Sequence, residues 1–480
     1  MPNTFTDALM RISASLVTLT AAGLSLAWAA DWPAFRGPNS GGVGTDVNLP
    51  VEMGPAKNMV WKTPLPPGHS SPVLSGDSIF VTAFDGPKLL VISLDRKSGA
   101  IKWRREAPRE RKQELHAKNS PASPSVATDG KNVYAFFTDF GLISYGWDGN
   151  ERWKLPLGPF NNPFGMGASP LLVKDRIIMS CDSETGSFLL AVNKDSGKVL
   201  WRVERPDVGR GFSTPILYDP PGGPTQALLP GSFQLISFDV SNGKPVWWAS
   251  GLTWQLKPTP VMDDKRVYVL GWAGGSDEGN QEEVMPWEEA VSKLDKDGDK
   301  LLAKDEILDR NLRNSFGECD LDKDGKIGAR DWEMYRRKRR SLNSITAFRL
   351  GGKGDVSDTH VAWRYTKSLP NAPSPLLYQG IVYLQKEGGI LTALDAESGK
   401  VLKQGRMAGA LDQYFASPVA ADGKIYMVSE SGHLVVVKAG ADWEVLAVND
   451  LDEPCYATPA LVDGRVYVRT AGHLYAFGAQ

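Results

Sequence analysis

Two short acidic loops in the middle of the chain combine the residue types and the spacing that bind calcium. Carboxylates stand at positions 1, 3, 5 and 12 of each loop: Asp295, Asp297, Asp299 and Glu306 in the first, and Asp320, Asp322, Asp324 and Asp331 in the second. Calcium takes about six to eight oxygen ligands, which an EF-hand loop supplies from these positions and from the backbone carbonyl at position 7, here Leu301 or Lys326. One such loop could be a solvated acidic turn, but two in tandem predict a pair of EF-hand calcium sites.

Both loops depart from the EF-hand pattern, and each departure predicts modest affinity. Position 6 takes a positive φ, which suits glycine; the second loop has Gly325 there, but the first has Lys300. The second loop ends in Asp331, which is one methylene shorter than glutamate, so bidentate ligation is harder. We expect dissociation constants of about 10⁻⁴–10⁻³ M, as in extracellular modules. The first ligands are 25 residues apart, so the loops must share one helix, and we expect a structural pair rather than a switch.

The segments around the loops predict helices at residues 281–294, 307–319 and 332–340. In the second segment Leu308, Leu312 and Phe316 recur at helical spacing. Leu302 and Ile327, at position 8 of the two loops, can pair the loops. The basic run RRKRR at residues 336–340 suits a helix C-terminus and offsets the nearby carboxylates. Contact with an acidic partner or an anionic lipid is the alternative for this run.

The rest of the chain is a repeat of strands. A Ser/Thr-Pro pair, an apolar stretch, a turn and a second apolar stretch recur eight times, with prolines at Pro72, Pro124, Pro170, Pro215, Pro260, Pro375, Pro418 and Pro459. The prolines are 41 to 52 residues apart, except for one gap of 115 residues that contains the calcium loops. A strand, a glycine turn and a tryptophan follow, as in VISLDRKSGAIKW. Four short strands in about 45 residues make one propeller blade.

Eight such units predict an all-β fold, an eight-bladed β-propeller of four-stranded antiparallel blades. The chain ends on the third strand of blade eight, and we expect residues 58–65 to supply the fourth strand and close the ring. Residues 30–276 then form blades one to five in part, residues 277–340 form an EF-hand pair inserted in blade five, and residues 341–480 complete the ring. Stacked β-sandwiches are the alternative, but the regular period argues against them. The turn tryptophans Trp103, Trp153, Trp201 and Trp247 should pack between neighbouring blades.

The combined pattern of S/T-P strand, G-K/R-I/V-Y strand and A-x-D-x-x-S/T-G-K-x-x-W resembles the pyrroloquinoline-quinone (PQQ)-type repeats. The resemblance covers nearly all of residues 31–480 except the insertion, and the start DWPAFRGPNSGGV resembles exported bacterial propellers of the same superfamily. It implies an eight-bladed propeller. Because the family includes both quinoprotein dehydrogenases and the non-enzymatic outer-membrane assembly lipoprotein of the Bam complex, the resemblance does not decide between enzyme and scaffold.

The insertion interrupts the second hairpin of blade five, which places it on the face where each first strand begins. The residues just before each Ser/Thr-Pro should ring the channel mouth on that face and form a ligand or partner surface: His69, Asn119, Met166, Arg210, Lys257, Asn371, Tyr414 and Tyr456. Two long connections, APRERKQELHAKNS and GPFNNPFGMGA, lie there too. Ser70 beside His69 could suggest a hydrolase, but Ser or Thr recurs at this position in other blades, which favours a structural role.

These features predict a non-catalytic scaffold that binds another exported or outer-membrane protein at the channel mouth. The alternative is a PQQ- and calcium-dependent dehydrogenase oxidising an alcohol or sugar, which needs a stacked quinone, a channel calcium and an Asp base. Alcohol-oxidising members resembling this chain cover the quinone with a vicinal cysteine pair, whereas Cys181, Cys319 and Cys455 are far apart. The mouth segments also show no carboxylate cluster. We therefore assign no catalytic residue and no PQQ-binding residue.

Composition and the N-terminus predict an exported protein. Residues 12–26 are apolar and are followed by Ala27-Trp28-Ala29, so residues 1–29 read as a signal peptide cleaved after Ala29. About 15 apolar residues fall short of the roughly 20 that a spanning helix needs, so we expect no transmembrane span in the mature chain. A net charge of −2 gives no sign of a nucleic-acid partner. We expect a periplasmic or secreted monomer.

Overall fold

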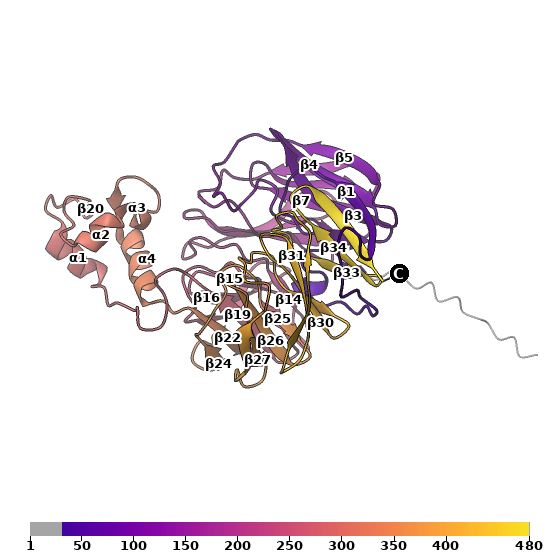
Figure 1. The fold of residues 1–480 in the computed structure, drawn as a ribbon. Helices are drawn as coiled ribbons and strands as arrows, with labels where there is room; N and C mark the ends of the chain where they lie inside the picture. The colour runs from indigo at the N-terminus through magenta and orange to yellow at the C-terminus, as the bar shows by residue number, and fades with distance from the viewer. Residues whose placement is uncertain (1–30, 480) are drawn as a thin grey trace, which may run out of the picture.

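The computed structural model describes residues 31–479, and the predicted signal peptide, residues 1–29, lies outside them. Eight antiparallel sheets are arranged as the blades of a propeller (Figure 1), so the predicted fold class is confirmed. Within the described residues, no helix has the length and apolar character needed to cross a bilayer.

The first four blades follow the chain order. Their strands are β2 (Val73–Ser75), β3 (Ser78–Asp85), β4 (Lys88–Asp95) and β5 (Ile101–Ala107); β6 (Ala127–Thr128), β7 (Asn132–Phe137), β8 (Gly141–Gly146) and β9 (Glu151–Pro156); β10 (Leu171–Val173), β11 (Arg176–Cys181), β12 (Phe188–Asn193) and β13 (Val199–Glu204); β14 (Ile216–Tyr218), β15 (Gln226–Gly231), β16 (Gln234–Asp239) and β17 (Pro245–Ser250). The short strand β23 (Gly354–Asp355), from the third hairpin of blade five, adds a parallel edge to β17.

The last four blades complete the ring. Their strands are β18 (Val261–Met262), β19 (Arg266–Gly271), β22 (Ser344–Arg349) and β24 (Val361–Tyr365); β25 (Leu376–Tyr378), β26 (Ile381–Lys386), β27 (Ile390–Asp395) and β28 (Val401–Arg406); β29 (Val419–Ala421), β30 (Lys424–Val428), β31 (His433–Lys438) and β32 (Glu444–Asp450); β33 (Ala460–Val462), β34 (Arg465–Arg469), β35 (His473–Gly478) and β1 (Met59–Pro64). β1 pairs antiparallel with β35, with Thr63 opposite Leu474, and so closes the ring as the sequence predicted.

Burial explains why the strands of one blade read differently in sequence. The two middle strands are covered on both faces by neighbouring blades, so β3 and β4 each have six consecutive buried positions, most of them apolar. The fourth strands lie at the outer edge, where β5 and β9 alternate buried and exposed positions. The core is therefore a series of apolar layers between adjacent blades.

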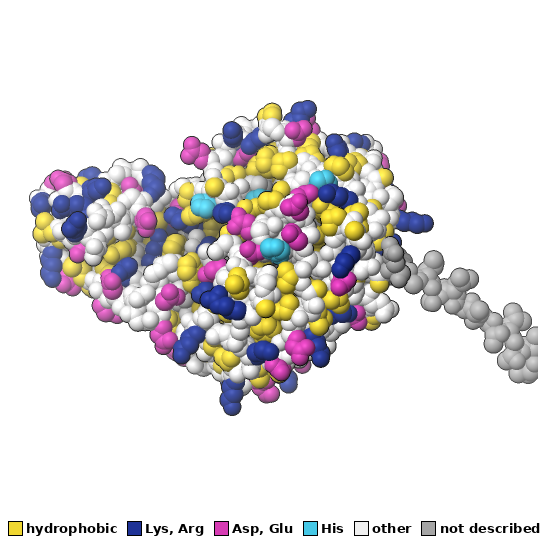
Figure 2. All heavy atoms as spheres, in the orientation of Figure 1, with side chains coloured by type: hydrophobic (Ala, Val, Ile, Leu, Met, Phe, Trp, Pro, Cys, Tyr) yellow, Lys and Arg dark blue, Asp and Glu magenta, His cyan; other side chains and the backbone are white. Residues whose placement is uncertain are grey.

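A helical module lies between β19 and β22 of blade five. It contains α1 (Trp287–Leu294), α2 (Arg310–Asn314), α3 (Phe316–Cys319), α4 (Ala329–Arg340) and the small sheet of β20 (Leu302–Ala303) and β21 (Lys326–Ile327). The module stands beside the propeller as a lobe whose surface carries many Lys, Arg, Asp and Glu side chains (Figures 1 and 2).

The helix predicted over residues 307–319 is wrong in detail. Ile307 is buried outside any helix, Leu308 is 69% exposed, and α2 starts only after Asp309, whose carboxylate accepts the Leu312 N–H as an N-cap. The helix breaks again at Ser315, which separates α2 from α3. Leu308 therefore does not share the apolar face of Leu312, because the cap at Asp309 starts the helix later than the spacing suggested.

Tryptophan and glycine form the seam between most blades. Each of five tryptophans on fourth strands stacks over the turn glycine of the next blade: Trp61 over Gly99, Trp103 over Gly149, Trp153 over Gly197, Trp201 over Gly243 and Trp363 over Gly399. At Gly197, φ is +71° and an added Cβ would lie 2.7 Å from the Trp153 ring, so only glycine fits. The packing predicted for three turn tryptophans is therefore found, and Trp61 and Trp363 extend it.

Two positions use other chemistry at the same seam. Trp247 is also fully buried in the layer between blades four and five, but its indole donates to Gln226 Oε1 at 3.1 Å. In blade six Lys403 replaces tryptophan, and its ammonium donates to Trp443 O at 2.8 Å and pairs with Asp442.

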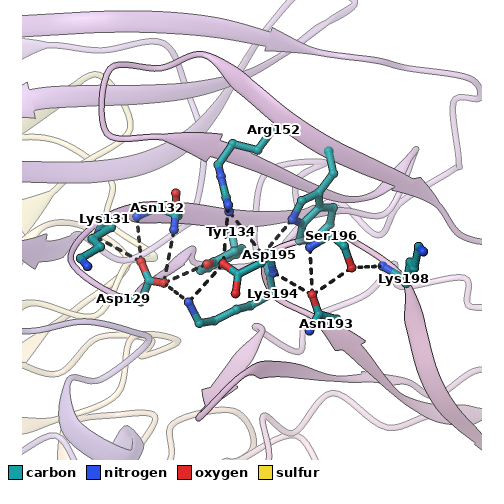
Figure 3. A network of polar contacts seen from close by, with 11 residues as sticks. Asp129, Lys131, Asn132, Tyr134, Arg152, Asn193, Lys194, Asp195, Ser196 and Lys198 are labelled. Carbon is teal, nitrogen blue, oxygen red and sulfur yellow. Dashed lines mark hydrogen bonds and ion pairs between the residues drawn. The ribbon is translucent and has the colours of Figure 1, made fainter.

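Polar contacts reinforce the seam between blades two and three (Figure 3). Asp129, in the first hairpin of blade two, accepts hydrogen bonds from Tyr134 Oη at 3.0 Å and from Lys194 Nζ of blade three at 2.7 Å. The carbonyl of Lys194 in turn accepts the Trp153 indole N–H at 2.8 Å. Lys194 therefore binds blade two through both its backbone and its side chain.

Candidate calcium loops and channel cavity

Each acidic loop gathers its first three aspartates around one point. Asp295, Asp297 and Asp299, and likewise Asp320, Asp322 and Asp324, place one carboxylate oxygen each within 4.8 Å of one another. The backbone turns inward around them, since Gly298 N donates to Asp295 Oδ1 at 2.7 Å. These two clusters are the groups of His, Cys, Asp and Glu side chains within residues 31–479 whose spacing suits a metal ion.

Asp320 gives independent support for a cation in the second loop. Its side chain is 5% exposed; Oδ2 accepts Gly325 N at 3.0 Å, but the buried Oδ1 has no hydrogen-bond partner. A buried carboxylate oxygen without a partner is costly, and a cation bound by Asp320, Asp322 and Asp324 would satisfy it. The donor set of the second loop therefore fits calcium.

The position-12 carboxylates hold the two loops in the same way. Glu306 accepts the backbone N–H groups of positions 2 and 9 of its loop, Lys296 at 2.7 Å and Ala303 at 2.8 Å. Asp331 accepts those of Leu321 at 3.4 Å and Gly328 at 3.0 Å. Both acids are buried, at 5% and 8% exposure. Glu306 and Asp331 thus lie inside their loops, and their role as ligands stays a prediction, as does that of the Leu301 and Lys326 carbonyls.

The loops are joined as a pair. Leu302 lies opposite Ile327 in the β20–β21 ladder, the pairing that the sequence predicted, and both side chains are fully buried. Across this ladder the Lys326 ammonium forms an ion pair with the Asp299 carboxylate, and this hydrogen bond lowers the pKa of Asp299. Calcium in the first loop would therefore have to displace the Lys326 ammonium of the second loop from Asp299.

Lys300 occupies a left-handed position, with φ +61°, where the second loop has Gly325 at φ +88°. An exposed loop can leave this conformation when no ion is bound, so the strain lowers the population competent to bind. Lys300→Gly removes about 1 kcal/mol of strain, and we expect calcium affinity at the first loop to rise about fivefold, measured by titration calorimetry. Lys300→Ala is the control, because it removes the charge but keeps the Cβ; an equal gain in this variant would contradict the backbone explanation.

The module is seated on blades three and four through its second loop and α4. Asn161 Nδ2 donates to Leu321 O at 3.1 Å, and the Arg330 guanidinium donates to Glu184 O at 3.0 Å. Leu321 and Met334 pack with Phe233 in a small apolar cluster. The second acidic loop therefore contacts the propeller.

The basic run at residues 336–340 is engaged within the chain. Arg337 lies over the Phe233 ring at 4.3 Å, and Lys338 lies over the Trp254 ring at 4.4 Å. Arg339 and Arg340 form ion pairs with Glu282 and Glu283, and Arg336 donates to Val284 O. The run thus fixes the module to itself and to the propeller, rather than forming a free basic patch.

A cavity of about 340 Å³, called the second cavity below, lies between the module and the propeller, beside the larger cavity of the central channel. Leu321, Met334 and Lys338 line it from the module. Phe164 and Gln255 line it from the propeller, and the same two residues also line the channel cavity. The module therefore adjoins the channel mouth.

The central channel holds a cavity of about 610 Å³ around a closed ring of hydroxyl groups. One residue of each blade donates its backbone N–H to the side-chain oxygen of the next, at N···O distances of 2.9–3.3 Å: Ser71, Ser125, Ser169, Thr214, Thr259, Ser374, Ser417 and Thr458, which returns to Ser71. The Ser/Thr of the repeat thus links all eight blades. In blade two the ring residue is Ser125, after Pro124 rather than before it, so the motif there is shifted by two residues.

The N-terminal segment forms a floor for this cavity. Residues 32–44 form hydrogen bonds with backbone groups in the first strands of four blades. Their partners each follow the hydroxyl-ring residue of the same blade by three positions: Leu74, Thr128, Leu217 and Ala420. The Phe35 ring lines the cavity. The segment therefore crosses the channel below the hydroxyl ring and leaves the mouth as the open end.

Five of the eight predicted mouth residues line the cavity: His69, Asn119, Lys257, Asn371 and Tyr456. The other three do not. Met166 and Tyr414 are 1% and 3% exposed and belong to the core layers between blades, so their neighbours Gly167 and Phe415 line the cavity instead. Arg210 borders the second cavity, where it forms an ion pair with Glu184. The number of residues between a position and the Ser/Thr-Pro pair therefore does not determine whether its side chain points into the channel.

Several lining residues were missed from the sequence. Gln255 and Trp272 come from blade five, and His116 and Lys118 come from the long connection before β6. Phe164 and Phe212 add aromatic walls, with their rings edge to face at 6.2 Å. The phenylalanines of the connection GPFNNPFGMGA were the available signal for the Phe164 wall.

The residues at the mouth do not form a nucleophile site. Ser70 is fully buried; its hydroxyl donates to Thr82 O at 3.1 Å and accepts the Arg469 guanidinium at 2.5 Å. The His69 ring stacks on Tyr456 at 4.2 Å, and burial, followed by the charge of Arg469, lowers the pKa of His69 to about 4. No hydrogen bond joins Ser70 and His69 in the described structure. The hydrolase hypothesis therefore has no geometric support.

The described lining of the channel cavity contains no Asp or Glu side chain. Glu430 lies at the rim, where it pairs with Lys118 and accepts Tyr456 Oη at 2.6 Å. Cys181, Cys319 and Cys455 are buried as free thiols. Among the described residues, the carboxylate clusters suited to a metal thus lie in the loops of the module and not in the channel lining.

The model of the protein family described as outer membrane protein assembly factor BamB matches residues 43–180 and 185–480. Among solved structures the chain is similar to BamB from Moraxella catarrhalis, at 12% identity and a TM-score of 0.55, over 88% of this chain and 98% of that one. It is also similar to a europium-containing methanol dehydrogenase, at 11% identity and a TM-score of 0.58, over 94% and 98% of the two chains. A search of curated proteins found no significant match. These structural similarities show the fold, which a scaffold and an enzyme share.

Proposed function

The chain belongs to the family described as outer membrane protein assembly factor BamB, and on that premise we propose that it is a calcium-binding scaffold without catalytic activity. The observation that carries this proposal is the separation of carboxylates from the channel. Within residues 31–479, the cavity lining offers hydroxyl, amide, aromatic and basic groups but no Asp or Glu. Quinone-dependent alcohol oxidation needs a channel calcium and a carboxylate base, and this lining supplies no carboxylate for either role.

Calcium in this proposal has a structural role in the module. Asp295, Asp297 and Asp299 would hold one ion and Asp320, Asp322 and Asp324 the other, with the position-7 carbonyls and the position-12 acids completing the oxygen sets. Neutralising these carboxylates would stabilise the β20–β21 pair and the α4 helix that seats the module. Calcium is common outside the cytoplasm, which agrees with an exported protein.

The binding surface for a partner would be the mouth face. The module stands there beside a rim formed by Asn119, Asn371 and Tyr456. The family description points to the outer membrane, so we propose a periplasmic or secreted monomer whose partner is another exported or outer-membrane protein. Nucleic acid is not proposed, since the basic run of α4 is already paired.

A PQQ- and calcium-dependent dehydrogenase remains the second candidate, because the cavity has aromatic walls, including Trp272, that could stack a planar ring. Incubating the purified chain with PQQ and calcium distinguishes the two. The scaffold proposal predicts no stoichiometric change in the quinone absorbance and no dye-linked oxidation of alcohols or sugars. Stoichiometric uptake together with turnover would contradict the scaffold proposal.

A further inference from the structure

Apart from its two connections to blade five, the module contacts the propeller through its second loop and α4. Asn161 Nδ2 donates to Leu321 O at 3.1 Å, and the Arg330 guanidinium donates to Glu184 O at 3.0 Å. By contrast, no hydrogen bond, ion pair or ring contact joins residues 287–319 to the propeller in the part of the chain that the structure describes. The first loop belongs to this unattached stretch, so the two loops differ in their relation to the propeller.

The contacts of α4 come from one face of the helix. Four side chains recur at positions i, i+4, i+7 and i+8 and so share that face: Arg330, Met334, Arg337 and Lys338. Met334 packs with Phe233, whose ring Arg337 covers at 4.3 Å, and Lys338 covers the Trp254 ring at 4.4 Å. In Figure 1 α4 lies on the propeller side of the lobe and α1 on the far side. This face of α4 therefore docks the module on the propeller.

Asp331 belongs to the second loop and to α4 at once. It is position 12 of the loop and the third residue of the helix, and its carboxylate accepts the N–H groups of Leu321 at 3.4 Å and Gly328 at 3.0 Å. The same loop contains the buried, partnerless Oδ1 of Asp320. Calcium bound there would fix the Leu321 peptide and the first turn of α4, which carries Arg330, and these groups make the hydrogen bonds to the propeller.

The two connections of the module to blade five form a narrow base. Ser276 Oγ and Ser341 Oγ form a hydrogen bond at 2.9 Å across it, and Asn343 Nδ2 donates to Asp277 Oδ1 at 2.9 Å. Gly275 in the first connection has φ +80°, a conformation that glycine adopts without strain. A module released from blades three and four would therefore stay tethered at this base and could turn about it.

We propose that calcium in the second loop docks the module on blades three and four, and that the module swings away on its two connections when this ion leaves. Release would uncover the Phe233 and Trp254 rings and open the second cavity, which Met334 and Lys338 line from the module. Calcium would thus regulate the surface that the mouth face offers to a partner. This inference rests on the proposed calcium binding and adds a division of roles, because calcium in the first loop would not control docking.

Hydrogen–deuterium exchange of the full chain, with calcium or with a chelator, tests this proposal. We expect calcium to slow exchange about fivefold or more, the lower end of typical coupling between sites, in the footprint of the module, residues 158–165, 182–186 and 231–235. Asp322→Ala should abolish this response. Asp297→Ala is the matched control, since it removes the same position-3 carboxylate from the first loop and should keep the response at calcium that saturates the second loop.

Peptides from α1 report whether the module stays folded, and they should remain protected in both variants. The proposal is overturned if the two variants change the footprint equally, if calcium leaves the wild-type footprint unchanged, or if α1 loses protection together with the footprint in Asp322→Ala, because the module would then unfold rather than swing. Calcium stoichiometry of the same samples separates the two proposals. A wild-type chain that binds no calcium contradicts the proposed function, whereas two bound ions without a footprint response contradict only this inference.

Discussion

Asp297→Ala/Asp322→Ala will not bind calcium at either loop at concentrations that saturate the wild type. Each substitution removes the middle carboxylate of a three-aspartate cluster, and calcium needs about six to eight oxygens. Starting from dissociation constants of about 10⁻⁴–10⁻³ M, a loss of about a hundredfold takes both loops out of the range of extracellular calcium. Titration calorimetry should show two binding events for the wild type and no binding heat for the double variant.

Thermal unfolding gives a second readout of the same substitution. A ligand present at about 100 times its dissociation constant stabilises the folded state by about 2.7 kcal/mol, so added calcium should raise the melting temperature of the wild-type module but not that of the double variant. Asp305→Ala is the matched control, because this exposed acid stands at position 11 of the first loop and is not a predicted ligand. Equal loss of binding in the control would point to general charge rather than to the loop geometry.

Arg469→Met should be the most destabilising single substitution at the ring closure. Arg469 ends β34 of blade eight, is 1% exposed, and donates to Ser70 O at 3.2 Å and to Thr82 O at 2.6 Å of blade one. Burial lowers the pKa of Arg469 to about 9, yet the side chain stays charged at neutral pH. Methionine fills similar volume but leaves the buried Ser70 carbonyl without the Arg469 donor, at about 1–3 kcal/mol, and removes the charged donor of Thr82 O, which still accepts the Ser70 hydroxyl. We expect a loss of about 2–4 kcal/mol in the free energy of unfolding, measured with urea.

Arg465→Met on the same strand is the control for this prediction. Arg465 is partly buried and donates a long hydrogen bond to Arg96 O at 3.4 Å, so its loss should cost less than about 1 kcal/mol. If both variants lost the same stability, the seam between blades one and eight would not depend on the hydrogen bonds of Arg469.

The repeat made most of the fold predictable. The Ser/Thr-Pro spacing identified eight blades because every copy must start its first strand at the same ring of hydroxyls. The turn glycines were predictable as well, since a positive φ and a stacked tryptophan leave room for no side chain, as at Gly197. The Leu302–Ile327 pairing followed from loop position alone.

Side-chain direction at the mouth could not be predicted in the same way. The segments before the first strands are irregular, so Met166 and Tyr414 turn into the core while their neighbours turn into the channel. The shift of blade two to Ser125 is another tertiary effect, because the hydroxyl ring and not the proline sets the register. The ion pair of Lys326 with Asp299 joins the two loops, so it could not be predicted from the residue spacing within either loop alone.

The number of calcium ions bound to the purified chain tests the account most directly. Equilibrium dialysis at calcium about ten times the wild-type dissociation constants should find close to two ions per wild-type chain and close to none per Asp297→Ala/Asp322→Ala chain, because both sites lie in the loops. An ion retained by the double variant would place a metal site elsewhere, with the channel as the first place to look. That result would contradict the account of a calcium-binding module on a channel without metal.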